Sequence, residues 1–215
     1  MRSLVPAASL LVALALLPGP SRADGIPEKG EGTVALMGGF RLIPQHAFLA
    51  TVEQQGLSIS QTQFQPQGTL FLGFMPADEL HATIGLGYGI DRYKISGGDL
   101  SIGSFTILLG ADTPLVQGDG WSIYGGGGLG YSLNTLTRGG VDTESNSTAG
   151  YLAVGLRYRL TGQFALVVED RYTLASAGYP PLNANVNVGG NVFSVGLLLH
   201  FNSPEDKGHP HAPGE

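Results

Sequence analysis

Residues 191–202 read Asn-Val-Phe-Ser-Val-Gly-Leu-Leu-Leu-His-Phe-Asn, and their alternation decides the fold class. Every second residue is large and apolar along this stretch: Phe193, Val195, Leu197, Leu199 and Phe201. The residues between them are small or polar, with one apolar exception at 198. Because successive residues of a β-strand point to opposite faces, the segment predicts a strand with one apolar face. Its 12 residues exceed the roughly 9–11 that a tilted strand needs to cross a bilayer.

The same two-residue period recurs upstream of this segment. We count eight segments, most of them 10 to 14 residues long, at 33–42, 66–75, 80–93, 100–111, 121–133, 149–160, 163–174 and 191–202. Strands of soluble proteins are usually about 5–6 residues long, so this length favours transmembrane strands. The sequence therefore predicts an all-β fold: an eight-stranded antiparallel transmembrane β-barrel with up-and-down connections.

The connections between the segments tend to alternate in length. Short turns on the periplasmic side and long loops outside are typical of outer-membrane barrels. The tight connections are 76–79 and 161–162, and the long ones are 43–65, 134–148 and 175–190. Two connections depart from the rule, because 96–99 is short for an external loop and 112–120 is long for a periplasmic turn. Eight strands would leave both ends of the chain in the periplasm.

Two architectures fit strands with one apolar face. In a soluble barrel that face points inward, whereas in a membrane barrel it meets lipid and the other face lines a narrow lumen. A face exposed to water would be rich in Lys, Glu and Asp, but this one is mostly Gly, Ser, Thr and Ala. Small residues suit the crowded interior of eight strands, and glycines such as Gly85, Gly87, Gly89 and the run 125–128 indicate room for neighbours. The sequence favours the membrane barrel.

Aromatic residues and one carboxylate add detail to the apolar face. Several aromatics lie near segment ends, as in interfacial girdles: Trp121, Phe201, Tyr158, Tyr88 and Tyr131. Asp170 also falls on this face, where a carboxylate costs about 1–3 kcal/mol. Either a bulge shifts the alternation there, or the residue lies near an interface.

The N-terminus has the three regions of a signal peptide. Arg2 supplies the positive start, the apolar run 7–17 follows, and small residues at 21 and 23 mark cleavage after Ala23. The apolar run is shorter than the roughly 17 residues that a membrane-spanning helix needs. We expect a signal peptide at 1–23, a short periplasmic leader at 24–31, the barrel at 32–202 and a disordered C-terminal tail at 203–215.

The composition excludes several classes of site. The chain has 215 residues and no Cys, so it has no disulfide, no thiol nucleophile and no Cys-based metal site. Its net charge is −6 and it has no basic cluster, which argues against nucleic acid as a partner. His209 and His211 lie in the Pro- and Gly-containing tail and are not expected to form a metal site. We expect no cofactor.

Two motifs resemble those of a known family. The alternation that ends at Phe201 resembles the C-terminal insertion signal of outer-membrane barrels, and Val168-Glu169-Asp170-Arg171-Tyr172 resembles a segment of small OmpA/OmpX/OmpW-type barrels. The resemblance covers residues 32–202 and implies a protein of the cell outer membrane. It also implies outer-membrane lipid and the barrel assembly machinery as partners. The family usually ends at the aromatic residue, whereas here the tail follows.

Four charged residues fall on the predicted lumen face of adjacent strands: Arg157, Arg159, Glu169 and Arg171. The tight turn at 161–162 places Glu169 diagonally near Arg157, and same-face spacing places it beside Arg171. Charged residues at membrane depth must pair or face a wet cavity. The four predict a salt-bridge plug that fills the barrel, with a gate or solute path as the alternative.

An enzyme is a further alternative, because some small barrels modify lipids at the outer rim. His46 is the one histidine on the external side of this layout, and Ser58 and Ser60 share its loop, but no spacing marks a triad. His81 and His200 lie toward the periplasmic ends. We therefore predict a non-enzymatic protein.

The function that fits these observations is an integral outer-membrane barrel with a structural or surface-interaction role and a narrow, plugged lumen. External ligands would meet its loops, above all 43–65. The alternatives are a small-solute channel, a soluble lipocalin-like barrel and the rim enzyme.

Overall fold

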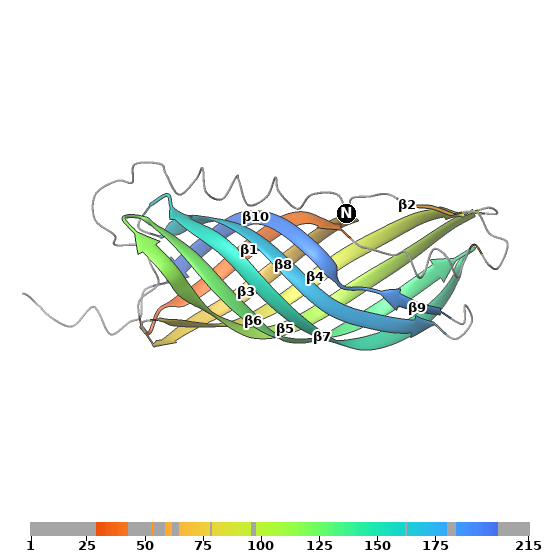
Figure 1. Ribbon diagram of the computed structural model, residues 1–215, viewed down its shortest axis with the longest axis horizontal. Helices are drawn as coiled ribbons and strands as arrows, with labels where there is room; N and C mark the ends of the chain where they lie inside the picture. The colour runs from red at the N-terminus through yellow and green to blue at the C-terminus, as the bar shows by residue number, and fades with distance from the viewer. Residues whose placement is uncertain are drawn as a thin grey trace, which may run out of the picture.

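The computed structural model describes residues 29–42, 53, 59–61, 65–77, 79–95, 98–161, 163–179 and 184–201. The expected signal peptide, most of the leader and the tail lie outside these residues. Eight long strands form the wall of a tilted barrel (Figure 1): β1 (Gly32–Leu42), β3 (Gln65–Ala77), β4 (Leu80–Ile95), β5 (Gly98–Gly118), β6 (Trp121–Arg138), β7 (Val141–Arg159), β8 (Phe164–Tyr179) and β10 (Gly190–Phe201). Two short strands, β2 (Ile59–Gln61) and β9 (Ala184–Asn187), pair with β4 and β8.

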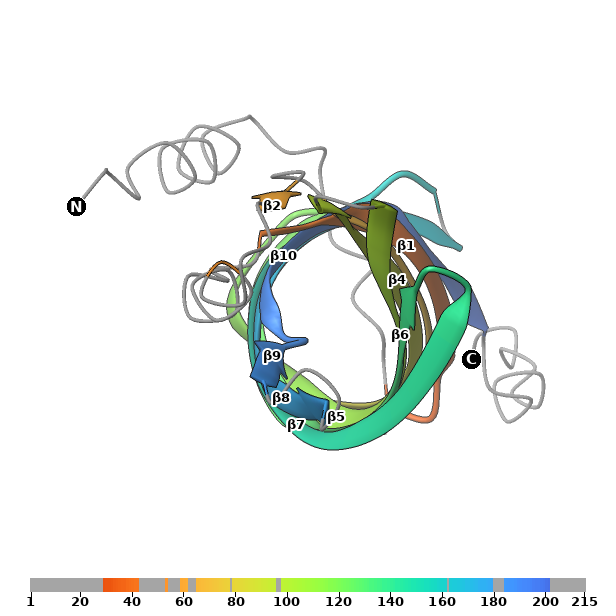
Figure 2. The same ribbon diagram turned by 90° about the vertical axis from the view of Figure 1, so that its right-hand side faces the viewer.

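The long strands follow one another around the ring, and all their pairs are antiparallel. The pairing of β1 with β10 closes the ring, with Gly32 opposite Phe201 and Leu42 opposite Asn191 (Figure 2). A closed ring leaves no strand edge at membrane depth, which is the condition for a sheet to cross a bilayer. The predicted eight-stranded up-and-down barrel is confirmed.

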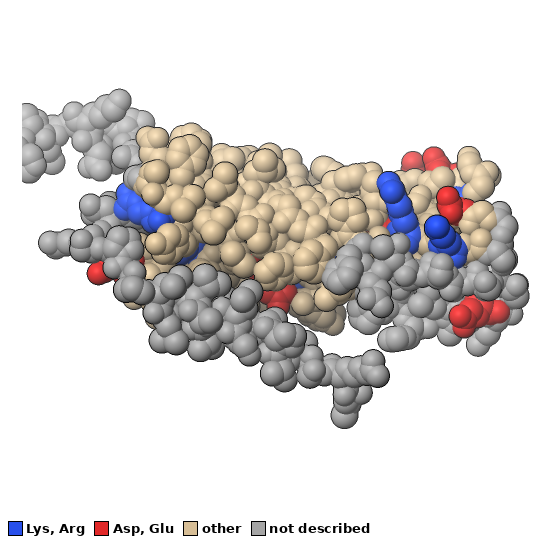
Figure 3. Space-filling view, turned by 90° about the horizontal axis from the view of Figure 1, so that it is seen from above, with Lys and Arg blue, Asp and Glu red and all other residues tan. Residues whose placement is uncertain are grey.

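The apolar faces of the strands point away from the barrel axis. Leu36 is 67% exposed, Leu129 73% and Leu152 71%, values that belong to a surface in contact with lipid. Figure 3 shows that charged side chains on one face of the molecule gather toward its two ends and leave a largely uncharged middle. In a soluble ligand-binding barrel the same residues would point inward, so the lipocalin-like alternative is set aside. No helix among the described residues is long and apolar enough to span a membrane.

The two ends of the barrel differ. At one end, which we name the turn end, β3–β4, β5–β6 and β7–β8 are joined by two to four residues and Gly32 pairs with Phe201. At the opposite end, the loop end, β4–β5 and β6–β7 continue as long hairpins, and β2 and β9 lie there (Figures 1 and 2).

Two predicted connections are strand instead. Residues 112–118 continue β5 through a register shift between Pro114 and Val116, so the turn at this end is only Asp119 and Gly120. Residues 134–138 and 141–148 extend β6 and β7, and the turn is Gly139-Gly140 with φ of 57° and 81°. Through the polar segments 134–138 and 141–148, cross-strand pairing continues because backbone hydrogen bonds do not require an apolar face.

The lumen is less uniformly polar than the sequence predicts. Two apolar clusters fill it beside the polar side chains. The turn-end cluster comprises Ala35, Met37, Phe71, Leu108, Tyr124, Tyr151, Ala165, Val167 and Leu198. The loop-end cluster comprises Tyr93, Leu100, Ile102, Leu136, Ala177, Tyr179, Val186 and Val188. Strict alternation underestimates such residues because inward positions can be apolar wherever rings and aliphatic chains pack against each other.

Asp170 remains on the outward face. No register shift occurs on either side of it, where it lies between Val154 of β7 and Phe193 of β10, so a bulge does not explain it. It is the seventh residue of β8, near the middle of the stretch that a strand needs to cross a bilayer. Its side chain is half-buried and hydrogen-bonds Asn191. The contact with Asn191 accommodates only part of this carboxylate, because its Oδ1 is buried and has no hydrogen-bond partner among the described residues.

Replacing Asp170 with Asn tests this arrangement. The amide keeps a partner for Asn191 and removes a formal charge from the apolar surface, so the free energy of unfolding should rise by about 1 kcal/mol. Urea-induced unfolding in phospholipid vesicles measures it. The same change at the exposed Asp99 should stay within about 0.5 kcal/mol of the parent. A loss of stability in Asp170→Asn greater than that of Asp99→Asn contradicts the prediction.

Candidate functional site

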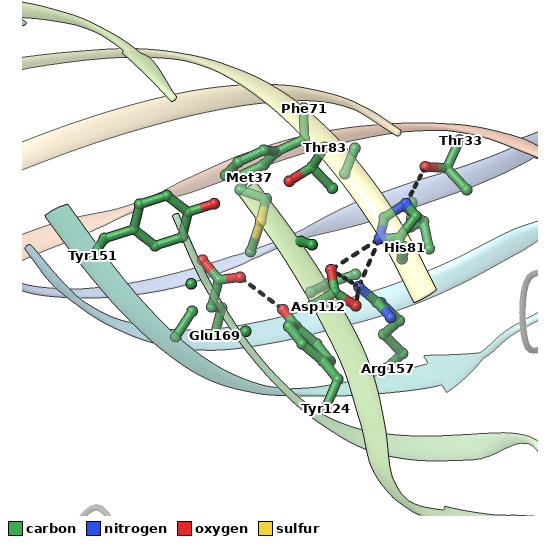
Figure 4. A pocket seen from close by; sticks show the side chains of 17 residues that line it. Thr33, Met37, Phe71, His81, Thr83, Asp112, Tyr124, Tyr151, Arg157 and Glu169 are labelled. Carbon is green, nitrogen blue, oxygen red and sulfur yellow. Dashed lines mark hydrogen bonds and ion pairs between the residues drawn. The ribbon is translucent and has the colours of Figure 1, made fainter. Parts of the chain in front are cut away.

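A chain of polar contacts crosses the lumen near the turn end. His81 is at its centre, with Nε2 2.8 Å from Oγ1 of Thr33 and Nδ1 2.9 Å from Oδ2 of Asp112. Arg157 donates from Nη2 to both oxygens of Asp112 at 2.8 Å. Figure 4 shows these four side chains converging from β1, β4, β5 and β7. The contacts therefore join strands from opposite parts of the wall.

The chain continues through an aromatic ring to a second ion pair. The guanidinium carbon of Arg157 lies 3.9 Å from the centre of the Tyr124 ring, whose hydroxyl donates to Oε2 of Glu169 at 2.8 Å. Oε1 of Glu169 accepts from Nε of Arg171 at 3.0 Å and from its Nη2. Arg171 in turn lies over the Phe71 ring at 4.7 Å. We name these residues the turn-end network: Thr33, His81, Asp112, Arg157, Tyr124, Glu169 and Arg171.

Glycines make the room that the large side chains of the network occupy. Tyr124 is directly opposite Gly155 on the neighbouring strand, and a Cβ built on Gly155 would lie 2.4 Å from the tyrosine ring. Phe71 faces Gly85 in the same way, with a Cβ at 2.6 Å from the ring. A Cβ on Gly73 would lie 2.1 Å from Nε2 of His81. The abundance of glycine in the strands thus follows from the packing of rings in a narrow lumen.

The structure brings three of the four predicted lumen residues into this network. Glu169 contacts Arg171 directly, as their same-face spacing suggests, whereas Arg157 reaches Glu169 through Tyr124. Arg159 lies at the end of β7, where its Nε donates to the carbonyl of Thr161 at 2.8 Å. The five residues of the predicted insertion signal lie on the outward face of β10, and Leu197 is 52% exposed.

The sequence interpretation missed Asp112 and Tyr124 as members of the site. Asp112 falls in the predicted connection 112–120, and Tyr124 directly precedes the glycine run 125–128. Both could have been found by counting, because Tyr124 has the opposite phase to the outward Trp121, and Asp112 continues the inward phase of Gly110. His81, which the sequence predicts to lie toward the periplasmic end of its strand, contacts both Thr33 and Asp112 and so links three strands.

A third ion pair lies toward the loop end. Nη2 of Arg41 is 2.5 Å from Oδ1 of Asp91, and Nη1 donates to the carbonyl of Val188 at 2.5 Å. Asp91 has no exposed surface and Arg41 is 5% exposed. The loop-end cluster contains Val188 and therefore packs beside this pair.

The cavity beside the turn-end network is small. A cavity of about 40 Å³ is lined by His81, Asp112, Tyr124, Tyr151, Arg157 and Glu169 among others. Since about 10–15 Å³ of such volume accommodates one water molecule, the cavity holds a few waters. Pockets for small-molecule ligands are usually about 300–1,000 Å³.

The order Thr33–His81–Asp112 is that of a nucleophile, a base and an orienting carboxylate. The surroundings suit catalysis poorly, because Thr33 and His81 are each 3% exposed and Arg157 holds Asp112. The adjoining cavity has no room for a substrate. His46 and Ser58 lie outside the described residues, and of Ser60 only the backbone is described. No group of three His, Asp or Glu side chains in the described part of the chain could hold a metal ion.

The close approach of Gly155 to Tyr124 leads to a stability prediction. Gly155→Ala should lower the free energy of unfolding by about 1–3 kcal/mol, because the new methyl group displaces the ring from Arg157 and Glu169. Gly150→Ala, on the same strand with nothing within 4 Å of its Cβ, is the matched control. Urea unfolding compares the two, and equal effects would contradict the assignment.

Comparison with known proteins agrees with the geometry. The sequence matches the family described as Outer membrane protein beta-barrel domain over residues 11–201. The structure is similar to the outer membrane protein OprG from Pseudomonas aeruginosa, with 17% identity, a TM-score of 0.54, and 84% of this chain and 99% of that chain covered. It is equally similar to Neisserial surface protein A, with 17% identity, a TM-score of 0.54, and 80% and 98% covered. These two likenesses concern the fold alone.

No significant match was found among curated proteins. The chain belongs to the outer membrane protein β-barrel domain family and is an integral β-barrel protein of the outer membrane.

Proposed function

We propose that this barrel has a structural or surface-interaction role and that the turn-end network is a plug that holds the lumen closed. One observation carries the proposal: the charged side chains of the turn-end network contact one another, and the cavity beside them is about 40 Å³. A path for solutes would need charged groups that face a continuous water-filled space.

The energetics of buried ion pairs support a plug. Arg171 is 2% exposed and Glu169 7%, so each charge is stabilised by its partner and by few waters. Removing one partner of such a pair leaves an uncompensated buried charge and typically costs about 3–5 kcal/mol. The network therefore stabilises the barrel only while it is complete.

The alternatives are less well supported. A small-solute channel must pass both the turn-end network and the loop-end cluster, whose Ile102 and Val186 have no exposed surface. A lipid-modifying rim enzyme would need a site outside the described residues, since the Thr33–His81–Asp112 arrangement is enclosed in the lumen. We infer a non-enzymatic role.

On this proposal, external contacts involve the β4–β5 and β6–β7 hairpins, which extend at the loop end beyond the apolar outward surface of the strands. Exposed charged residues of both signs lie on them: Arg92, Lys94, Asp99, Arg138, Asp142 and Glu144. The loop 43–65, proposed as the main contact for an external ligand, lies largely outside the described residues. Its β2 segment pairs with the end of β4, where Ile59 is opposite Ile95.

Recognition by the barrel assembly machinery is proposed for β10. Its outward residues Phe193, Val195, Leu197, Leu199 and Phe201 form an apolar row that ends in an aromatic side chain. The row is on the strand that closes the ring against β1.

The plug is tested by Glu169→Ala. We expect the free energy of unfolding to fall by about 3 kcal/mol, because Arg171 loses its buried partner. Planar-bilayer recordings of the parent protein should show no discrete conductance steps. Glu144→Ala, an exposed carboxylate on the β6–β7 hairpin, is the control and should change stability by less than about 0.5 kcal/mol. Unchanged stability of Glu169→Ala, or step-like conductance of the parent, would overturn the plug.

The sidedness of the barrel has a direct test because the protein has no cysteine of its own. Val141, 68% exposed on the β6–β7 hairpin, and the exposed Asp119, in the turn-end β5–β6 connection, are each replaced with Cys. In intact cells a membrane-impermeant maleimide should label Val141→Cys, whereas Asp119→Cys should react only after the outer membrane is permeabilised. The reverse pattern would contradict a periplasmic turn end.

A further inference from the structure

The segment 184–189 has fewer strand partners than the eight long strands of the wall. Its first four residues form β9, which pairs with 176–179 of β8 and, among the described residues, with no other strand. It then leaves the ladder at Val188 and Gly189, whose N–H groups both donate to the carbonyl of Ala175 at 3.1 and 3.3 Å. We name residues 184–189 the strap.

The strap carries apolar side chains into the mouth of the barrel. Val186 has no exposed surface and Val188 is 4% exposed. Both belong to the loop-end cluster, where they meet Tyr93 of β4 and Ile102 of β5. Val186 and Val188, in a segment paired with β8, thus complete an apolar layer with side chains of β4 and β5 on the opposite wall. Without the strap, this layer would be open toward the outside.

A single arginine ties the strap to that opposite wall. Arg41 is one residue from the end of β1, and its two terminal nitrogens divide between Asp91 of β4 and the carbonyl of Val188. The backbone carbonyl is thereby held by a buried cation whose charge is balanced by a buried carboxylate. Hydrogen bonds to charged groups are among the stronger ones in proteins.

The junction of the strap with β10 requires glycine. Gly190 has φ of 111°, which side chains rarely allow. A Cβ on Gly189 would lie 2.2 Å from the carbonyl oxygen of Thr173. The strap thus ends at two glycines, the second of which pairs with Thr173 of β8, and it is held by a short ladder to β8 and by a charged contact with Arg41 of β1.

We propose that the strap is a gate at the loop end of the lumen and that Arg41 is its latch. In the latched state the two valines close the apolar layer over the Arg41–Asp91 pair. When the Arg41–Val188 contact breaks, the strap swings about Gly189 and Gly190 and opens the upper lumen to the outside. This inference adds a movable closure above the turn-end plug of the proposed function, and it concerns a different set of residues.

The test uses Val186→Cys as a reporter in the otherwise cysteine-free barrel. In detergent-extracted, heat-modifiable protein, a charged maleimide should react slowly at this buried position. Adding Arg41→Gln should accelerate the reaction roughly tenfold or more, because opening no longer breaks the charged contact. Gly189→Ala should do the same by displacing the strap, without altering any charge. This second variant keeps the test decisive if Arg41→Gln fails to fold.

Matched controls separate local opening from loss of the fold. Arg92→Gln removes an exposed arginine, and Gly38→Ala adds a methyl group where nothing lies within 4 Å. Neither should change the rate at Val186→Cys by more than about twofold. Ala165→Cys, 1% exposed in the turn-end cluster, reports global unfolding and should stay protected in every variant.

Two results would overturn the gate: unchanged labelling at Val186→Cys in both strap variants, or equal acceleration at Ala165→Cys. Neither depends on the plug, which is judged by the unfolding of Glu169→Ala. A strap that opens while the bilayer conductance stays at baseline supports both ideas, because the turn-end network still closes the lumen below.

Discussion

The closure of the strand ring is the constraint on which the rest of the structure depends. A bilayer offers no water to unpaired backbone groups, so every N–H and carbonyl at membrane depth must find a partner in a neighbouring strand. The pairing of β1 with β10 meets this condition. It also encloses a narrow lumen, because only eight long strands form the ring. Everything inside must then fit a narrow space, and everything outside must suit lipid.

The narrow lumen explains why glycine and large polar side chains occur together. Tyr124 and Phe71 lie directly across from Gly155 and Gly85, because two side chains at those positions would overlap. The charges that remain inside cannot reach bulk water, so Arg157 contacts Asp112 and Arg171 contacts Glu169. The same packing that excludes water makes each charge depend on its partner, and this links the stability of the barrel to its closure.

The two halves of the lumen are closed in different ways. At the turn end, the contacts run between long strands that are each held by two neighbours, so the network is part of the rigid wall. At the loop end, part of the closing surface comes from β9, which has a ladder of four residues and is followed by Gly189 and Gly190. Segments with few ladder bonds open at lower free energy than the strands beside them. The difference in attachment supports a fixed plug at one end and a movable strap at the other.

The sequence by itself determined the class of fold, the number of strands and the direction of their faces. A period of two is a local property, so it can be counted, and it correctly put Glu169 and Arg171 on one face and Leu197 on the other. It misjudged 112–118 and 134–148, because the register shift at Pro114 and the polar hairpins break the pattern of apolar residues without ending the pairing. Only the tertiary structure decided which lumen residues meet. Contacts such as His81 with Asp112, or Arg41 with Val188, depend on strand stagger and ring closure, which bring together residues far apart in the chain.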